Sequence, residues 1–154
     1  MQRRQLINNG SVVLGLAAMA GLIPTSSFAQ NAAGWNKGAF DGKSLNDVVK
    51  AMGGTSATLS KDVVLNAPEI AENGNVVRMG LESKLAGTTQ IALLVEKNPS
   101  LLSAAFDVMA GSDASFATNV KMGQTSNVYA LAKVGDKYFY AVKEVKVTLG
   151  GCGG

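Results

Sequence analysis

Residues 128–149 read VYALAKVGDKYFYAVKEVKVTL. This stretch predicts a β-hairpin, because two runs rich in β-branched and aromatic residues, 128–134 and 137–149, flank the dipeptide Gly135-Asp136. A two-residue loop that begins with Gly joins antiparallel strands, since Gly readily adopts the positive φ that such turns require. The second run should continue as a strand to about residue 149, because apolar and polar residues alternate there: Val145, Val147 and Leu149 against Lys146 and Thr148.

The same period of two extends upstream of the hairpin. The expected strands lie in residues 63–65, 77–82, 91–96, 104–109 and 116–122. Pro68, Asn73-Gly74 and Asn98-Pro99 are turn signals between them. Some seven short strands without a helix between them predict a mainly β fold, an antiparallel immunoglobulin-like β-sandwich. The Cys–Trp–Cys pattern of true immunoglobulin domains is absent from the sequence, so only an immunoglobulin-like relative is expected.

One N-terminal helix is expected, over residues 44–52. Ser44 can cap it, Asp47 approximates a capping box, and Gly53 provides a stop. The apolar residues Leu45, Val48, Val49 and Met52 fall on one stripe. Residues 31–38 are expected to form a loose lead, in which Trp35 packs on the domain or on a partner.

The first strand of the hairpin is apolar on both faces, with Val128, Ala130 and Ala132 on one side and Tyr129 and Leu131 on the other. Such a strand is either buried on both faces within its own domain or covers a partner. A sandwich has one inner face per sheet and only one helix is expected as cover, so the sequence favours a partner.

Residues 1–29 resemble an export signal. Arg3 and Arg4 precede an apolar stretch over residues 12–23, and small residues precede a cleavage point after Ala29. The arginine pair resembles a twin-arginine signal; an ordinary secretory signal is the alternative. The expected organisation is therefore a signal peptide over 1–29, one immunoglobulin-like domain over 30–149 and a tail over 150–154, in a periplasmic protein without a membrane anchor.

Charge and composition exclude several functions. Without the signal, the 154-residue chain is 125 residues long, and 12 Lys and Arg (14 less Arg3 and Arg4) face 11 Asp and Glu. This balance gives no reason to expect nucleic-acid or membrane-surface binding. The sequence contains no His and one Cys, so we expect no metal site, no cofactor and no triad-type catalysis.

The single cysteine, Cys152, lies between two glycine pairs, Gly150-Gly151 and Gly153-Gly154. Glycine loses the most conformational freedom on ordering, so this tail is predicted to be mobile and thin. Residues 150–152, extended at ~3.3–3.6 Å each, would carry the thiol on the order of 10 Å from its anchor. No basic residue neighbours Cys152 in the sequence, so we expect its activation to come from another protein.

Four stretches resemble one family. The C-terminal run KEVKVTLGGCGG, residues 143–154, is similar to the C-terminus of SoxY, the sulfur-carrier family of the periplasmic Sox thiosulfate-oxidising system. Further similarities are NAPEIAENG at 66–74, the Asn-Pro to Phe segment at 98–106 and KMGQTS at 121–126. The chain differs from the family pattern at Arg78 and Asn119.

The resemblance implies a carrier and not an enzyme. Cys152 would hold thiosulfate-derived sulfur covalently, on a swinging arm formed by Gly150, Gly151, Gly153 and Gly154. A SoxZ-like subunit would be the stable partner. A SoxAX-type cytochrome, a SoxB-type hydrolase and possibly a SoxCD-type dehydrogenase would act on the arm in turn.

Two other functions remain open from the residues alone. One is an independent thiol enzyme or redox protein, which the absence of a CxxC pair and of His disfavours. The other is a structural immunoglobulin-like interaction module that dimerises through a Cys152–Cys152 disulfide.

Overall fold

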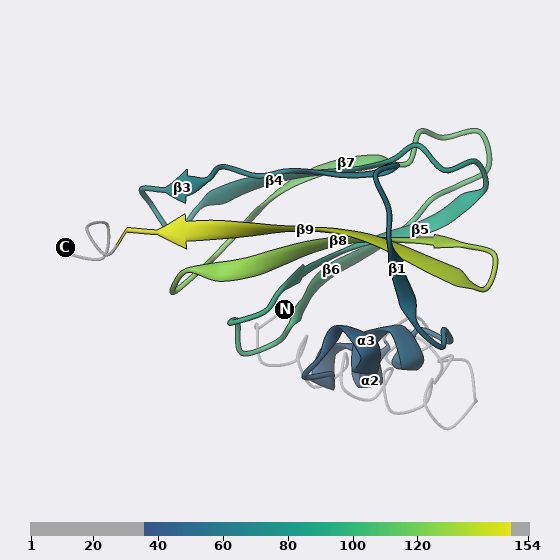
Figure 1. Ribbon diagram of the computed structural model, residues 1–154, viewed down its shortest axis with the longest axis horizontal. Helices are drawn as coiled ribbons and strands as arrows, with labels where there is room; N and C mark the ends of the chain where they lie inside the picture. Colours follow the sequence, from purple (N-terminus) through teal and green to yellow (C-terminus); the bar gives the residue numbers. More distant parts are fainter. Residues whose placement is uncertain (1–35, 149–154) are drawn as a thin grey trace, which may run out of the picture. The chain divides into compact units, whose positions relative to one another are not determined.

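Two β-sheets face each other in the computed structural model, which describes residues 36–148 (Figure 1). Two short helices precede nine strands. The elements are α2 (Lys37–Asp41), α3 (Leu45–Ala51), β1 (Ala57–Leu59), β2 (Val63–Asn66), β3 (Ile70–Ala71), β4 (Val77–Ser83), β5 (Thr88–Val95), β6 (Leu102–Asp107), β7 (Ser115–Val120), β8 (Ser126–Val134) and β9 (Lys137–Val147). The mainly β, immunoglobulin-like sandwich predicted from the sequence is confirmed.

The β8–β9 hairpin is the centre of the larger sheet. Its strands run in the order β1-β9-β8-β5-β6, with β3 also paired to β9, whereas β2-β4-β7 form the smaller sheet. Val134 and Lys137 are register partners, and Gly135 between them has φ +57°. The predicted two-residue loop beginning with Gly is therefore present, and glycine accepts this φ without strain.

The expectation of a purely antiparallel sandwich was wrong at one edge. Both β1 and β3 run parallel to β9, with Leu59 beside Tyr140 and Ala71 beside Val147. Parallel neighbours need a long connection rather than a tight turn, and here most of the described residues lie between the paired strands. Strands of three and two residues carry too little alternation to be recognised in the sequence.

The predicted helix is present as α3. Ser44 is its N-cap, and its Oγ accepts a hydrogen bond from the Asp47 N–H at 3.2 Å. Hydrogen bonding with the Ser44 side chain also lowers the pKa of the Asp47 carboxyl. Both interactions belong to a capping arrangement in which side chain and backbone satisfy each other.

A second helix, α2, corrects the expectation of a single helix and of a loose lead over residues 31–38. Asn36 caps it, its Oδ1 accepting from the Ala39 N–H at 3.1 Å. The Asn36 Nδ2 donates to the Ala51 carbonyl at 2.7 Å, which ties the start of α2 to the end of α3. Trp35 and the rest of that lead lie outside the described residues.

The larger sheet is buried on its inner face and, beneath the two helices, on part of its outer face. Val128, Ala130 and Ala132 of β8 join the core between the two sheets. Leu131 of β8 and Tyr138 of β9 instead join a second core, which α2 and α3 cover. The sequence favoured a partner as cover for β8, but the helices of this same unit bury Leu131. Among the described residues no helix is long and apolar enough to span a bilayer.

Candidate functional site

The predicted sulfur site lies just beyond the described residues. Cys152 and its four flanking glycines are outside them, as are Arg3 and Arg4 of the expected signal. The last described residue is Thr148, four residues before Cys152. At ~3.3–3.6 Å per extended residue, that separation corresponds to a reach of about 13 Å. The end of β9 is therefore the root of the tail.

This root is held from two sides. On the β3 side, the Lys146 N–H donates to the Glu69 carbonyl at 2.9 Å and the Thr148 N–H donates to the Ala71 carbonyl at 3.2 Å. On the β8 side, the Val147 N–H donates to Thr125 Oγ1 at 3.1 Å. Val145 is buried in the core between the sheets. The chain is thus anchored by backbone bonds and by packing up to the last described residue.

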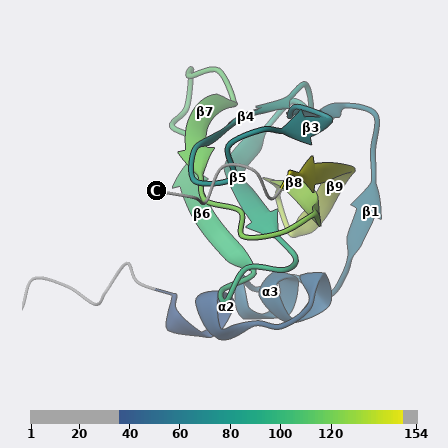
Figure 2. The same ribbon diagram turned by 90° about the vertical axis from the view of Figure 1, so that its left-hand side faces the viewer.

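The stretches that carry the SoxY resemblance meet at this root. The Met122 N–H donates to the Gly74 carbonyl at 2.7 Å, and the Asn98 Nδ2 donates to the Lys121 carbonyl at 2.9 Å. Together with the bonds of Ala71 and Thr125 to β9, these contacts join segments 66–74, 98–106 and 121–126 to residues 143–148. Figure 2 views the unit from this end, with the ends of β9 and β3 toward the reader.

Position 74, in one of these segments, requires glycine because another segment passes very close to it. A Cβ added there would stand 2.3 Å from the Met122 carbonyl oxygen. Backbone atoms cannot yield as a flexible side chain would, so a larger residue would separate the two segments beside the root.

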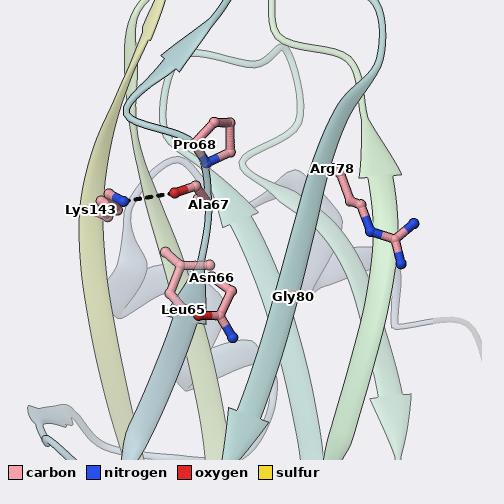
Figure 3. Close-up of a pocket in the computed structure, with 7 residues that line it drawn as sticks. All are labelled: Leu65, Asn66, Ala67, Pro68, Arg78, Gly80 and Lys143. Carbon is pink, nitrogen blue, oxygen red and sulfur yellow. Dashed lines mark hydrogen bonds between the residues drawn. The ribbon is translucent and has the colours of Figure 1, made fainter.

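A surface pocket lies close to this end of the sandwich (Figure 3). It is lined by Leu65, Asn66, Ala67, Pro68, Arg78, Gly80 and Lys143. Its volume of about 380 Å³ would suit a small ligand. However, the Lys143 Nζ already donates to the Ala67 carbonyl at 2.7 Å, and Figure 3 shows the Arg78 side chain pointing away. The polar groups do not converge, so the pocket lacks the features of a ligand site.

The described residues also offer no metal centre, since no three of their His, Cys, Asp or Glu side chains cluster. Arg78 and Asn119, where the sequence differs from the SoxY pattern, are register partners on β4 and β7. Both are exposed on the outer face of the smaller sheet and neither contacts the root through a hydrogen bond that we observe.

Sequence reasoning missed two supports of the root, β3 and Thr125. Ile70–Ala71 is too short for a periodic pattern, and the role of Thr125 depends on a neighbour 22 positions away. The only indication in the sequence that β3 and Thr125 matter was that both lie inside segments that resemble SoxY.

Fold and site define a small two-sheet β-sandwich protein whose last strand continues into a glycine-flanked cysteine tail. The family model described as "Sulfur oxidation protein SoxY" matches residues 49–152. The chain belongs to the SoxY family. It is similar to the sulfur carrier protein SoxY from Chlorobium limicola f thiosulfatophilum, with 33% identity, a TM-score of 0.61, and coverage of 68% of this chain and 96% of that chain.

Two weaker similarities have TM-scores too low to support an argument. One is a chain from a structure of T-cell activation by the bacterial superantigen toxic shock syndrome toxin-1, with a TM-score of 0.40, 13% identity, and coverage of 56% of this chain and 99% of that chain. The other is the PKD domain of an M14-like peptidase from a Thermoplasmatales archaeon, with a TM-score of 0.37, 13% identity, and coverage of 55% and 91%. No curated protein matches the chain.

Proposed function

We propose that this protein is a periplasmic sulfur carrier that holds thiosulfate-derived sulfur covalently on Cys152. One observation carries the proposal. The SoxY family match extends to residue 152, the position of the only cysteine, which is four residues beyond Thr148, the last described and still hydrogen-bonded residue. Residues 150–154 then act as the swinging arm, and Gly150, Gly151, Gly153 and Gly154 keep it thin enough to enter a cleft.

Loading is an oxidation. The Cys152 thiol and thiosulfate join through a new S–S bond, releasing one proton and two electrons, which a SoxAX-type cytochrome accepts. The product is a thiosulfonate on Cys152. Water then cleaves its terminal S–S bond in a SoxB-type hydrolase, giving sulfate, a proton and a persulfide on Cys152.

The carrier itself catalyses neither step. Among the described residues no three His, Cys, Asp or Glu side chains cluster as metal ligands would, which is consistent with a division of labour between arm and enzymes. A SoxCD-type dehydrogenase could oxidise the remaining sulfane where the host has one. Residues 1–29, with Arg3 and Arg4, serve as a twin-arginine signal, and a SoxZ-like subunit forms the stable heterodimer.

The test is a Cys152→Ser variant beside the wild type in a reconstituted thiosulfate-oxidising system. We expect normal folding by circular dichroism and complete loss of activity, because the serine hydroxyl is a far poorer nucleophile than a thiolate. Intact mass of wild-type protein from thiosulfate-grown cells should show an adduct of thiosulfate or sulfane mass on Cys152.

Two outcomes would reject the proposal. Thiosulfate oxidation supported by the Ser variant would show that Cys152 is not the carrier atom. A protein found only as a Cys152–Cys152 disulfide dimer, without sulfur adducts, would favour the structural interaction module instead.

A further inference from the structure

The helices cover only part of the outer face of the larger sheet. Tyr138, Leu131 and Leu94 lie beneath α2 and α3 and are buried. Further along the same strands toward the root, this cover ends. Figure 1 shows α2 and α3 near the turn end of the β8–β9 hairpin and not near the arrowhead of β9.

The part beyond the helices is apolar and aromatic. It consists of Leu59 on β1 and Val142 on β9, which are exposed, and of Tyr140 on β9 and Tyr129 on β8, which are half-buried against the margin of the helix-covered core. We call these four residues the tyrosine face. Leu59 and Val142 are 63% and 44% exposed, whereas Leu131, the register partner of Tyr140, is 1% exposed. Register pairs link Leu59 to Tyr140 and Val142 to Tyr129, and the two tyrosine rings are tilted with centroids 6.1 Å apart.

One more exposed apolar residue lies on this face nearer the root, beside Lys146. Ala71 of β3 points into the core between the sheets, so its neighbour Ile70 points to the outer face, where it is exposed. Of the five large hydrophobic side chains exposed in residues 36–148, three therefore lie on this one face: Leu59, Ile70 and Val142. Single exposed apolar residues are ordinary, but several on one face of a sheet favour an interaction surface.

The adjoining edge of β9 is also open. On this side β1 pairs with Tyr138–Tyr140 and β3 with Lys146–Val147, and no described strand pairs with residues 141–145 between them. An unpaired strand edge is a site where another chain can add a strand unless an element or charges cover it. The open edge and the tyrosine face meet at Val142.

Charges at the rim indicate what kind of surface would cover it. Glu96 accepts a hydrogen bond from Asn127 at 2.8 Å, and Glu144 is the register partner of Asn127, so two carboxylates border the face on one side. Residues 140–147 of β9 contain two lysines. Lys146 lies on this outer face, whereas Lys143 lies on the opposite face, because successive side chains of a strand alternate. A second copy would therefore add mostly carboxylates at this rim, whereas a different protein with Lys or Arg there would be complementary.

We propose that the tyrosine face is where the SoxZ-like partner subunit binds, through an apolar centre with basic side chains opposite Glu96 and Glu144. This inference rests on the proposed heterodimer and locates its interface. Tyrosines provide large contact areas at little entropic cost and are enriched in interface centres. A partner seated here lies beside the root of the arm.

The test uses the processed protein purified from its host and the purified SoxZ-like subunit. Val142→Lys and Leu59→Lys each place a charge in the apolar centre at a position already exposed, and Met109→Lys, at a residue 79% exposed in the β6–β7 loop, is the matched control. We expect both face variants to bind the subunit at least ~10-fold more weakly by calorimetry, with the control within about 2-fold. Glu144→Lys should slow association and reduce its salt dependence.

Hydrogen exchange provides a readout that does not depend on any variant. Binding should protect the amides of β9 over residues 141–145 and leave those of β7 unchanged. Unaltered affinity in both face variants, protection confined to the smaller sheet, or a wild-type homodimer that Val142→Lys dissolves would each overturn the inference. If the subunit binds elsewhere while Cys152 still accumulates sulfur, this inference fails and the proposed function stands; without the adduct, the proposed function fails.

Discussion

Tyr138 is the residue that holds the helical layer on the larger sheet. Its side chain is 1% exposed, and its hydroxyl donates to the Met52 carbonyl at 2.6 Å, satisfying an acceptor at the end of α3. The chain just after α3 passes against the ring. A Cβ added at Gly54 would lie 2.4 Å from Tyr138 Cδ2. Glycine is therefore required at position 54 by close approach to a buried ring.

A Gly54→Ala substitution should test this contact. We expect the free energy of unfolding to fall by roughly 1–3 kcal/mol, because a packed ring must shift to accept the methyl group. Gly123→Ala is the control, since no atom lies within 4 Å of its added Cβ, and it should change stability by less than about 0.5 kcal/mol. Urea unfolding followed by circular dichroism measures both; equal stability of the two variants would contradict the explanation.

Tyr129 provides a pH-dependent readout of the tyrosine face. Partial burial, followed by the charge of Glu96, raises the pKa of its phenol above the ordinary value. A raised folded-state pKa means that the folded protein holds this proton more tightly than the unfolded chain. The associated stability is present below the unfolded pKa, near 10, and is lost as pH rises through the folded pKa.

Ultraviolet titration of tyrosinate absorbance checks this expectation. The wild type minus Tyr129→Phe difference should show one group titrating above pH 10, and the variant should lose less stability than the wild type across that range. A difference curve with its midpoint below about 10 would show that the phenol is well solvated or near a cation.

At the scale of elements, β9 serves two purposes. Its central part completes the hairpin core through Ala141 and Val145, while its end is clamped between β3 and the Thr125 hydroxyl. Clamping the root fixes the point from which the chain continues toward Cys152. An anchored strand end followed by glycines is compatible with the proposal that the Cys152 sulfur is presented to several partner enzymes.

Larger side chains on the arm should therefore slow its reactions with partner enzymes without changing the reactivity of the Cys152 thiol itself. We expect Gly151→Val and Gly153→Val to leave the Cys152 thiol fully titratable by a small disulfide reagent but to slow enzymatic loading at least ~10-fold, since β-branched side chains widen and stiffen the arm. Single-turnover loading measured by intact mass gives the rates. Loading rates equal to wild type would show that the glycines do not serve entry into a cleft.

At the scale of the whole molecule, the proposed twin-arginine signal and the proposed heterodimer together predict that export and assembly are linked. Twin-arginine export carries folded proteins, so a SoxZ-like subunit bound in the cytoplasm would be exported with the chain. Arg3→Lys together with Arg4→Lys should retain both proteins in the cytoplasm. Arg78→Lys, the third arginine of the sequence, is the matched control and should not affect export.

Cell fractionation with blots for both proteins measures the outcome. Periplasmic accumulation of the double variant at wild-type level would favour an ordinary secretory signal. Loss of this chain alone from the periplasm, with the partner still exported, would separate export from assembly.

Local patterns in the sequence determined much of this protein. The hairpin across Gly135-Asp136, the capped helix at Ser44 and the main strands were all predictable, because turn chemistry, capping and two-residue alternation depend on near neighbours in the chain. The SoxY resemblance was confirmed over residues 49–152. Cys152 as the carrier atom remains a prediction that rests on the sequence, since it lies outside the described residues.

Only the tertiary structure decided which distant segments meet. The parallel pairing of β3 with β9 brings Ala71 to Thr148, 77 positions away, and no local pattern encodes that distance. The same holds for the outer face of the larger sheet. The sequence showed that β8 is apolar on both sides, but packing determined that α2 and α3 cover Leu131 and leave Val142 exposed, because helix length and position limit how much of a sheet they can bury.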